Sequence, residues 1–314
     1  MPTPIIFDTD PGHDDAIALL LAARAPEIRL LAVTVVAGNQ TLEKTTLNAR
    51  RVMTIGQVRD VPLAAGMAGP LLRPLKAAGH VHGESGLDGY DFGRPEIALV
   101  AEHAVDLMIR TVREAPAPVT LVPVGPLTNV AMALLRAPEI VEGVERIVLM
   151  GGAAHLGNVT PAAEFNIHCD PEAAAIIFGA GIPITMVGLD ATLQARIRPA
   201  ERERIRALGT PVGSMVASLL AWYAESARRR DGRDDPPVHD ALAVAAVIRP
   251  GIVETRRVNV VVETTGEYTA GRTVCDLNGV TDRPPNADVA VGVDREAFAE
   301  LLVEGLGRYG RARS

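Results

Sequence analysis

Five short aliphatic runs limit the possible folds of this chain more than any other feature. They cover residues 4–7, 29–36, 119–124, 146–150 and 183–187, and their apolar residues are mostly consecutive rather than alternating with polar ones. Continuous apolar strands are typical of parallel sheets whose two faces are both covered by helices. Helical patterns surround these runs at about residues 14–25, 41–55, 98–114, 129–137, 171–180, 199–208, 213–229, 239–248 and 295–306. The alternation predicts an α/β fold with an open, mostly parallel sheet and helices on both faces.

The C-terminal region departs from this alternation. Between residues 257 and 293 a strand-like run (258–263) lies among Gly, Asp and Asn turns, which predicts a small antiparallel addition. The sequence has no repeat and no stretch of linker composition, so we expect residues 1–314 to form a single domain. Residues 77–95 lack periodicity, and irregular loops of this length are usually functional or disordered. The charged run 228–237 is expected to be a solvated helix end and loop.

Charge and cysteine content exclude several classes of protein. The formal net charge is −7, which gives no basic footprint for nucleic acid. Only Cys169 and Cys275 are present, so a disulfide framework is excluded and a reducing compartment is favoured. No basic leader followed by an apolar segment begins the sequence, and no apolar run reaches the roughly 18 residues of a membrane span. We therefore expect a cytoplasmic protein that binds neither nucleic acid nor membranes.

Four carboxylates lie where the first apolar run is followed by the first helical pattern. They belong to residues 8–15 (DTDPGHDD), and so many like charges repel one another unless positive charge lies among them. A helix N-terminus supplies part of that charge, and a divalent cation with oxygen ligands would supply the rest. A turn of solvated acids would account for Asp14 or Asp15 alone. It accounts poorly for Asp8 and Asp10 at the end of the strand.

Polar or glycine residues follow each of the five apolar runs. In an open parallel sheet, ligands bind beyond the carboxyl ends of the strands, so these positions are expected to converge on one edge. The positions are Asp10, Asn39, Gly125, Gly151, Gly152 and Asp190.

Two further groups of residues suit a binding site. Asn158, Glu164 and Asn166 surround Phe165, and such amide and carboxylate groups suit a sugar, whose hydroxyls both donate and accept hydrogen bonds. The second group is His239-Asp240, at the start of an apolar helical pattern, where the two side chains would serve neighbouring parts of one site. A lone histidine at a helix start is more often structural, so on its own this group leaves both interpretations open.

The motif DTDPGHDDA at residues 8–16 resembles the N-terminal motif of the nucleoside hydrolases that prefer inosine, uridine and related ribonucleosides. The likeness extends over nearly the whole chain, because other short motifs occur in the family's order. These are VTVVAGN (33–39), HG (82–83), GPLTN (125–129), GG (151–152), AEFN (163–166), DPEA (170–173) and HD (239–240). Each is weak alone, but the acid cluster followed by AEFN and HDA at these separations is a specific signature.

This resemblance implies the nucleoside hydrolase fold and the hydrolysis of the N-glycosidic bond of a ribonucleoside to ribose and a free base. It implies Ca²⁺ as cofactor and, as family members are dimers or tetramers, a homodimer or homotetramer. The implied calcium ligands are the side chains of Asp10, Asp15 and Asp240 and the main-chain carbonyl of Val124. The residues implied to hold the ribose are Asp14, Asn39, Asn158, Glu164 and Asn166, with Phe165 beside the sugar.

Three residues are implied to take part in catalysis. Asp10 would accept a proton from the attacking water, and His239 would protonate or hydrogen-bond the departing base. His82 would relay to His239 or line the base pocket. Because a histidine in this loop is associated with pyrimidine-preferring members, uridine and cytidine are favoured, with inosine left open. His13 stands where the family usually has an aliphatic residue, and we expect it to be a solvent-facing loop side chain.

Two other functions compete with this interpretation. An Asp-x-Asp after a first parallel strand also begins phosphatases of the haloacid dehalogenase type, in which Asp8 would be the nucleophile and Asp10 the acid/base. That class holds phosphate with a lysine from a later loop, whereas lysine is confined here to Lys44 and Lys76. A catalytically silent protein that binds nucleosides or ribose is the second alternative.

Overall fold

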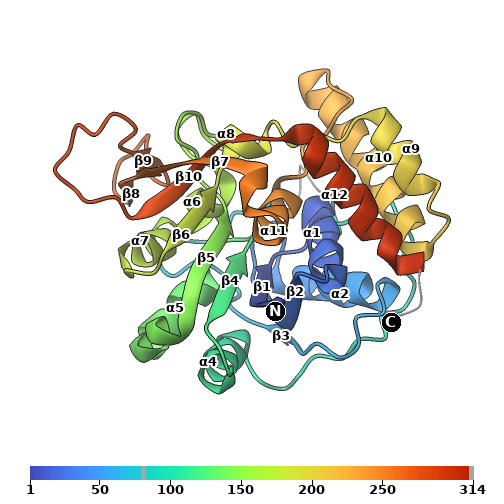
Figure 1. Ribbon diagram of the computed structural model, residues 1–314, viewed down its shortest axis with the longest axis horizontal. Coiled ribbons are helices and arrows are strands. Elements are labelled where there is room, and N and C mark those ends of the chain that lie inside the picture. The colour runs from blue at the N-terminus through green and yellow to red at the C-terminus, as the bar shows by residue number, and fades with distance from the viewer. Residues whose placement is uncertain (79–82, 311–314) are drawn as a thin grey trace.

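A computed structural model describes residues 1–78 and 83–310, and its centre is an eight-stranded sheet (Figure 1). All neighbouring strands pair in parallel except the last two, β10 and β7, which are antiparallel. In spatial order the strands are β3 (Leu63–Ala65), β2 (Ile28–Val35), β1 (Thr3–Thr9), β4 (Val119–Pro123), β5 (Val144–Met150), β6 (Ile184–Val187), β10 (Ala287–Val293) and β7 (Val253–Val258).

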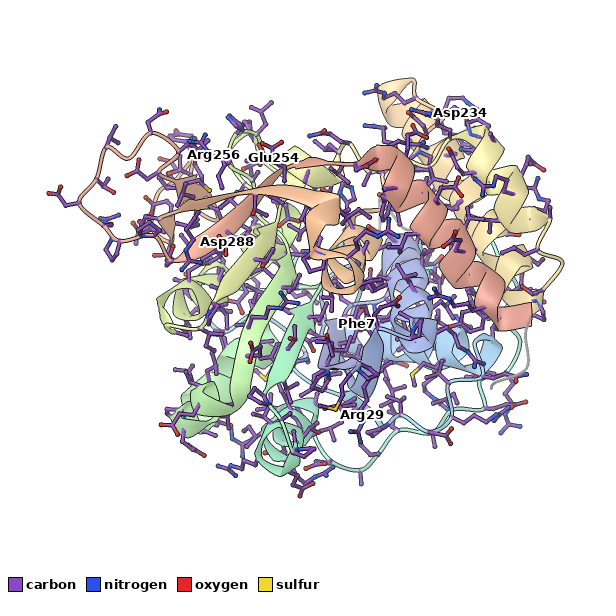
Figure 2. All side chains as sticks on the ribbon, in the orientation of Figure 1. Phe7, Arg29, Asp234, Glu254, Arg256 and Asp288 are labelled. Carbon is purple, nitrogen blue, oxygen red and sulfur yellow. The ribbon has the colours of Figure 1, made fainter. Side chains whose placement is uncertain are left out.

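Helices cover both faces of this sheet, as the apolar runs predicted. Side chains of β1 alternate between two apolar cores, with Ile5 and Phe7 in one and Ile6 in the other. The first core packs against α1 (His13–Arg24), α2 (Leu42–Ile55), α9 (Pro199–Arg206), α10 (Pro211–Asp231), α11 (His239–Ile248) and α12 (Arg295–Gly307). The second packs against α4 (Ala104–Glu114), α5 (Thr128–Arg136) and α7 (Pro171–Gly179). Figure 2 shows Phe7 inside the molecule and charged residues such as Asp234 at its periphery.

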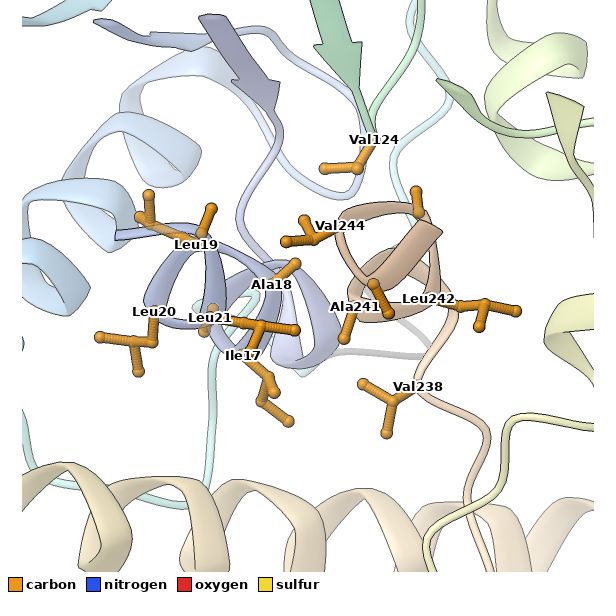
Figure 3. Close-up of a cluster of buried hydrophobic side chains, with 14 of the residues drawn as sticks. Ile17, Ala18, Leu19, Leu20, Leu21, Val124, Val238, Ala241, Leu242 and Val244 are labelled. Carbon is orange, nitrogen blue, oxygen red and sulfur yellow. The ribbon is translucent and has the colours of Figure 1, made fainter. Parts of the chain in front are cut away.

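Helices α1 and α11 lie side by side beneath the carboxyl edge of the sheet (Figure 3). Their contact is apolar and almost fully buried, with Ile17 and Leu21 on α1 and Ala241 and Val244 on α11. Because both helices begin at the same edge, this contact brings their N-termini together although more than 200 residues separate them in the sequence.

The predicted antiparallel addition is confirmed. Strands β8 (Val260–Val262) and β9 (Thr273–Cys275) form a separate two-stranded antiparallel sheet that projects at the left of Figure 1. The helix predicted over 98–114 begins only at Ala104, because the His103 side chain caps it while the amide of Val100 donates to the carbonyl of Leu63. Within the described residues, none of the helices is both long and apolar enough to cross a membrane.

Asn129, near the start of α5, ties three segments together beneath the carboxyl edge. Its Nδ2 donates to Asp8 Oδ1 at 2.8 Å and to the Val35 carbonyl at 3.1 Å, and its Oδ1 accepts from the Met67 amide at 2.8 Å. The Thr34 hydroxyl also donates to Asp8 Oδ1, at 2.6 Å. Asp8 and Asn129 are buried, so these bonds fix the ends of β1 and β2 relative to α5.

We expect Asn129→Ala to lower the free energy of unfolding by about 2–4 kcal/mol, because the buried Asp8 side chain loses one of its two donors and the Met67 amide loses its acceptor. Urea denaturation followed by circular dichroism measures the loss. Asn259→Ala is the matched control, since its half-buried side chain donates to the Pro284 carbonyl in a solvent-exposed hydrogen bond, and it should cost less than about 1 kcal/mol. Equal losses in the two variants would contradict this role of Asn129.

Candidate active site

A cavity of about 1010 Å³ opens where the carboxyl ends of β2, β4 and β5 meet. Most of the residues selected from the sequence line it, namely Asp14, Asn39, Val124, Asn158, Glu164, Phe165, Asn166, His239 and Asp240. Asp10 and Asp15 do not line the cavity but lie under its floor, each 1% exposed. His82 lies outside the described residues.

The floor is built around Asp10, which follows β1. Its Oδ2 accepts a hydrogen bond from the amide of Asn39 at 2.7 Å, whereas its buried Oδ1 has no hydrogen-bond partner among the described residues. Glycines allow this close packing, because a Cβ at Gly38 would lie 2.2 Å from Oδ2 and one at Gly125 only 2.4 Å from Oδ1. Burial raises the pKa of Asp10 well above its ordinary value, and Asp15 raises it further.

Three more carboxylates meet above Asp10. Oxygen atoms of Asp14, Asp15 and Asp240 lie within 4.8 Å of one another, and all three residues are buried. Burial and then the neighbouring acids raise the pKa values of Asp14 and Asp240. Asp15 is held from below by the Thr9 hydroxyl (2.6 Å) and Asn39 Nδ2 (3.1 Å). The first turns of α1 and α11 thus place these three carboxylates next to one another.

This arrangement fits a hard metal ion. The clustered donors of Asp14, Asp15 and Asp240 are carboxylate oxygens, the atoms that calcium and magnesium prefer, and the nearby Asp10 keeps a buried Oδ1 without a hydrogen-bond partner among the described residues. Several buried like charges also need a cation in order to remain ionised together. The aspartate cluster can therefore hold a metal ion. The carbonyl of Val124 accepts from Asn166 Nδ2 at 2.7 Å and has a second lone pair available.

The opposite wall carries the amide and carboxylate groups expected for a sugar. Glu164 caps α6 (Phe165–Cys169), and its carboxylate accepts from the amides of Asn166 (3.0 Å), Ile167 (3.2 Å) and Gly152 (2.9 Å). Burial raises the pKa of Glu164, while these amides lower it. Asn158 is exposed at the rim, where its Oδ1 accepts from the amide of Phe165 at 3.0 Å.

A tight turn after β5 supports this wall. Gly152 has φ of +74°, and a Cβ there would lie 2.9 Å from the Thr273 side chain. The Thr273 hydroxyl donates to the Ala153 carbonyl at 2.7 Å and accepts from the Ala153 amide at 2.9 Å. Strand β9 of the small sheet therefore fixes the turn whose Gly152 amide holds Glu164.

Helix α10 forms the remaining wall, and it corrects the expectation for His13. His13 is 1% exposed rather than solvent-facing. Its ring stacks on Trp222 at 4.5 Å and 9°, and its Nε2 lies 2.7 Å from the Asp88 carbonyl. Burial lowers the pKa of His13 to about 4. The expectation was wrong because α10 crosses the first turn of α1, a contact between segments far apart in the chain.

The sequence patterns did not single out the individual positions of this wall. Its cavity-lining residues on α10 are Trp222, Tyr223, Glu225, Ser226 and Arg229, and Leu193 and Arg196 line the cavity from the segment after Thr192. Trp222, Ser226 and Arg229 follow helical i, i+4, i+7 spacing, a signal that marks one face of α10. Thr192 was also missed. Its Oγ1 lies 2.8 Å from His239 Nδ1.

The phosphatase alternative required Asp8 as an accessible nucleophile. Asp8 is 1% exposed, does not line the cavity and is bound to Thr34 and Asn129. Burial raises its pKa to about 7. Its geometry is that of a structural residue.

Comparisons with known proteins agree with this geometry. The family model for inosine-uridine preferring nucleoside hydrolase matches residues 5–300. Pyrimidine-specific ribonucleoside hydrolase RihA of Salmonella agona (strain SL483) is 49% identical over 310 residues, which are 98% of this chain and 100% of the relative. RihA of Salmonella arizonae is 49% identical over 311 residues, 99% of this chain and 100% of the relative.

Two solved structures have the same fold. The plant nucleoside hydrolase PpNRh1 superposes with a TM-score of 0.91 at 34% identity, and the purine-preferring ribonucleoside hydrolase from Gardnerella vaginalis with 0.92 at 32%. Each comparison covers 98% of this chain and 99% of the other. The chain therefore belongs to the inosine-uridine preferring nucleoside hydrolase family and is an enzyme of the nucleoside hydrolase class.

Proposed function

We propose that this protein hydrolyses pyrimidine ribonucleosides, uridine and cytidine above all, with Ca²⁺ as its cofactor. One observation carries the proposal: buried aspartates and a wall of amide and carboxylate groups face each other across one cavity. The choice of base is supported by the names of relatives 49% identical over nearly the whole chain. The Gardnerella vaginalis structure is named for purines and has the same fold, so the fold itself does not determine the base.

The reaction breaks the bond from C1′ of ribose to the base nitrogen. The electron pair leaves with the base, and C1′ gains oxocarbenium character. The oxygen of water then bonds to C1′ and keeps one proton, and the water's other proton accounts for the one that the base gains. Asp10 would accept the proton of water, because its buried Oδ1 has no other partner among the described residues. Glu164, Asn158 and Asn166 would orient the sugar from the opposite wall, with Phe165 packed beside it.

The proposed calcium ligands are Asp10, Asp15, Asp240 and the carbonyl of Val124. Asp14 lies beside the proposed ligands Asp15 and Asp240. Because Asp14 and Asn39 also line the cavity, we propose that these two residues bind the ribose hydroxyls. A bound calcium ion would supply the positive charge that lets these acids ionise together and would acidify a neighbouring water.

His239 is proposed to protonate or hydrogen-bond the departing base, on which negative charge develops. It lines the cavity next to Asp240 and begins α11. His82, assigned with it from the sequence, stays a prediction. We further propose one domain over residues 1–314, a homodimer or homotetramer and a cytoplasmic location. Light scattering of the purified protein measures the number of subunits.

Removing calcium should lower both activity and thermal stability, because the buried carboxylates lose the charge that offsets their repulsion. After dialysis against chelator, Ca²⁺ at about 100 times its dissociation constant should stabilise the fold by about 2.7 kcal/mol. Asp240→Asn should abolish this rise in melting temperature. Asp288→Asn, the same change on an exposed strand residue, should keep it. Full activity in excess chelator would reject the metal.

His239→Ala should reduce kcat for uridine by about 10²–10⁴, the usual contribution of a positioned acid. p-Nitrophenyl riboside should be affected far less, because nitrophenolate leaves without a proton. His155→Ala is the control: this exposed histidine pairs with Asp190 and does not line the cavity. Similar losses on both substrates in His239→Ala would argue against a role at the leaving group.

A steady-state panel tests the substrate. Uridine and cytidine should exceed inosine in kcat/KM, and 2′-deoxyuridine should be at least about a hundredfold poorer than uridine, because buried groups that hold the 2′-hydroxyl lose their partner. Ribose release is measured by a reducing-sugar assay. Phosphate release from p-nitrophenyl phosphate would instead favour the phosphatase. Binding of uridine without turnover would favour a silent binding protein.

A further inference from the structure

The short helix α8 (Leu189–Thr192) ends at a hydroxyl that contacts the proposed leaving-group residue. Thr192 is fully buried, and its Oγ1 lies 2.8 Å from Nδ1 of His239. Thr192 itself does not line the cavity, whereas His239 does. The contact is therefore made behind the imidazole, on the protein side of the ring.

Backbone hydrogen bonds hold α8 in place. The amide of Leu189 donates to the Gly152 carbonyl at 2.9 Å, and the amide of Thr192 donates to the Gly188 carbonyl at 3.0 Å. Gly188 packs so closely on the turn after β5 that a Cβ there would lie 2.6 Å from the Gly152 carbonyl oxygen. The Thr192 hydroxyl is thus anchored to the same turn that holds Glu164.

The segment before His239 is joined to the segment after Thr192. The amide of Val238 donates to the Ala195 carbonyl at 3.0 Å, and the amide of Ile197 donates to the Pro236 carbonyl at 3.1 Å. Arg196 and Pro237 form an isolated β-bridge between these two bonds. Thr192 lies just before this short antiparallel bridge on one segment and His239 just after it on the other, so the bridge holds the two segments together beside their contact.

The chemistry of a hydroxyl suits this position. Threonine Oγ1 can donate to an imidazole nitrogen or accept from its N–H, so it satisfies Nδ1 in either tautomer. A hydrogen bond at one ring nitrogen fixes the orientation of the imidazole and therefore the direction of the other nitrogen. Nδ1 contacts Thr192, so we assign Nε2, on the far side of Cε1, to the cavity that His239 lines.

We propose that Thr192 is a positioning residue that holds the His239 imidazole with Nε2 directed at the departing base. The inference rests on the proposed function and adds to it a residue that touches neither substrate nor metal. Without the hydroxyl, the ring keeps its place in α11 but loses the bond that fixes its rotation.

The test compares Thr192→Val with Thr192→Ser on uridine and on p-nitrophenyl riboside. Valine has nearly the same shape without the hydroxyl, so kcat for uridine should fall about 10- to 100-fold while p-nitrophenyl riboside is nearly unaffected. Serine should restore most of the uridine rate. Thr120→Val is the matched control, because Thr120 is 1% exposed and its hydroxyl has no partner among the described residues. It should change neither rate.

A double-mutant cycle separates positioning from a general structural effect. In the His239→Ala background, Thr192→Val should cause no further loss on uridine, because the two residues act as one unit. Additive losses, or equal losses on both substrates, would overturn the inference. So would a serine variant as slow as the valine variant.

A spectroscopic measurement tests the positioning without relying on turnover. Long-range ¹H–¹⁵N spectra of the histidine rings should show altered Nδ1 and Nε2 shifts for His239 in Thr192→Val relative to the wild-type protein, because Nδ1 loses its hydrogen bond. Unchanged shifts would overturn the inference about Thr192. Altered shifts in a protein that does not hydrolyse uridine would support the positioning and reject the proposed function.

Discussion

Repulsion among buried carboxylates is the constraint on which the rest of this structure depends. Asp10, Asp14, Asp15 and Asp240 are buried close together, and burial and the neighbouring acids raise the pKa values of Asp10, Asp14 and Asp240. Helix N-termini offset part of this cost, and two of them meet here. The Asp14 carboxylate accepts from the amides of His239 and Asp240, so the first turn of α1 caps the first turn of α11. A cation completes the compensation.

Apolar packing supplies the free energy that holds these charges together. The faces of α1 and α11 that meet in Figure 3 are almost completely buried, and each fully buried aliphatic side chain contributes on the order of 1.5–3 kcal/mol. Asn129 and Thr34 fix Asp8 at the end of β1. Asp8 and Asp10 are two residues apart in the chain, yet Asp8 stabilises the end of β1 whereas Asp10 belongs to the candidate active site.

The strands β1, β2, β4, β5 and β6 and most of the cavity could be predicted because they depend on local patterns, whereas β7 and β10 were not predicted as strands of the main sheet. Continuous apolar runs mark buried parallel strands, and the residues after them must share one edge. Strand β3 has only three residues, too few for a pattern. The burial of His13 depends on α10, and the role inferred for Thr192 depends on a contact with His239, 47 positions away. No local signal specifies such contacts between distant segments.

The small antiparallel sheet has a consequence for how the enzyme is made. Every side chain that lines the described part of the cavity precedes residue 241, yet the turn beneath Glu164 is buttressed by Thr273. A nascent chain that has emerged only to residue 250 carries the complete set of lining groups without that buttress. We therefore expect the turn that supports Glu164 to reach its final geometry late in synthesis, after β9 has left the ribosome and packed against it.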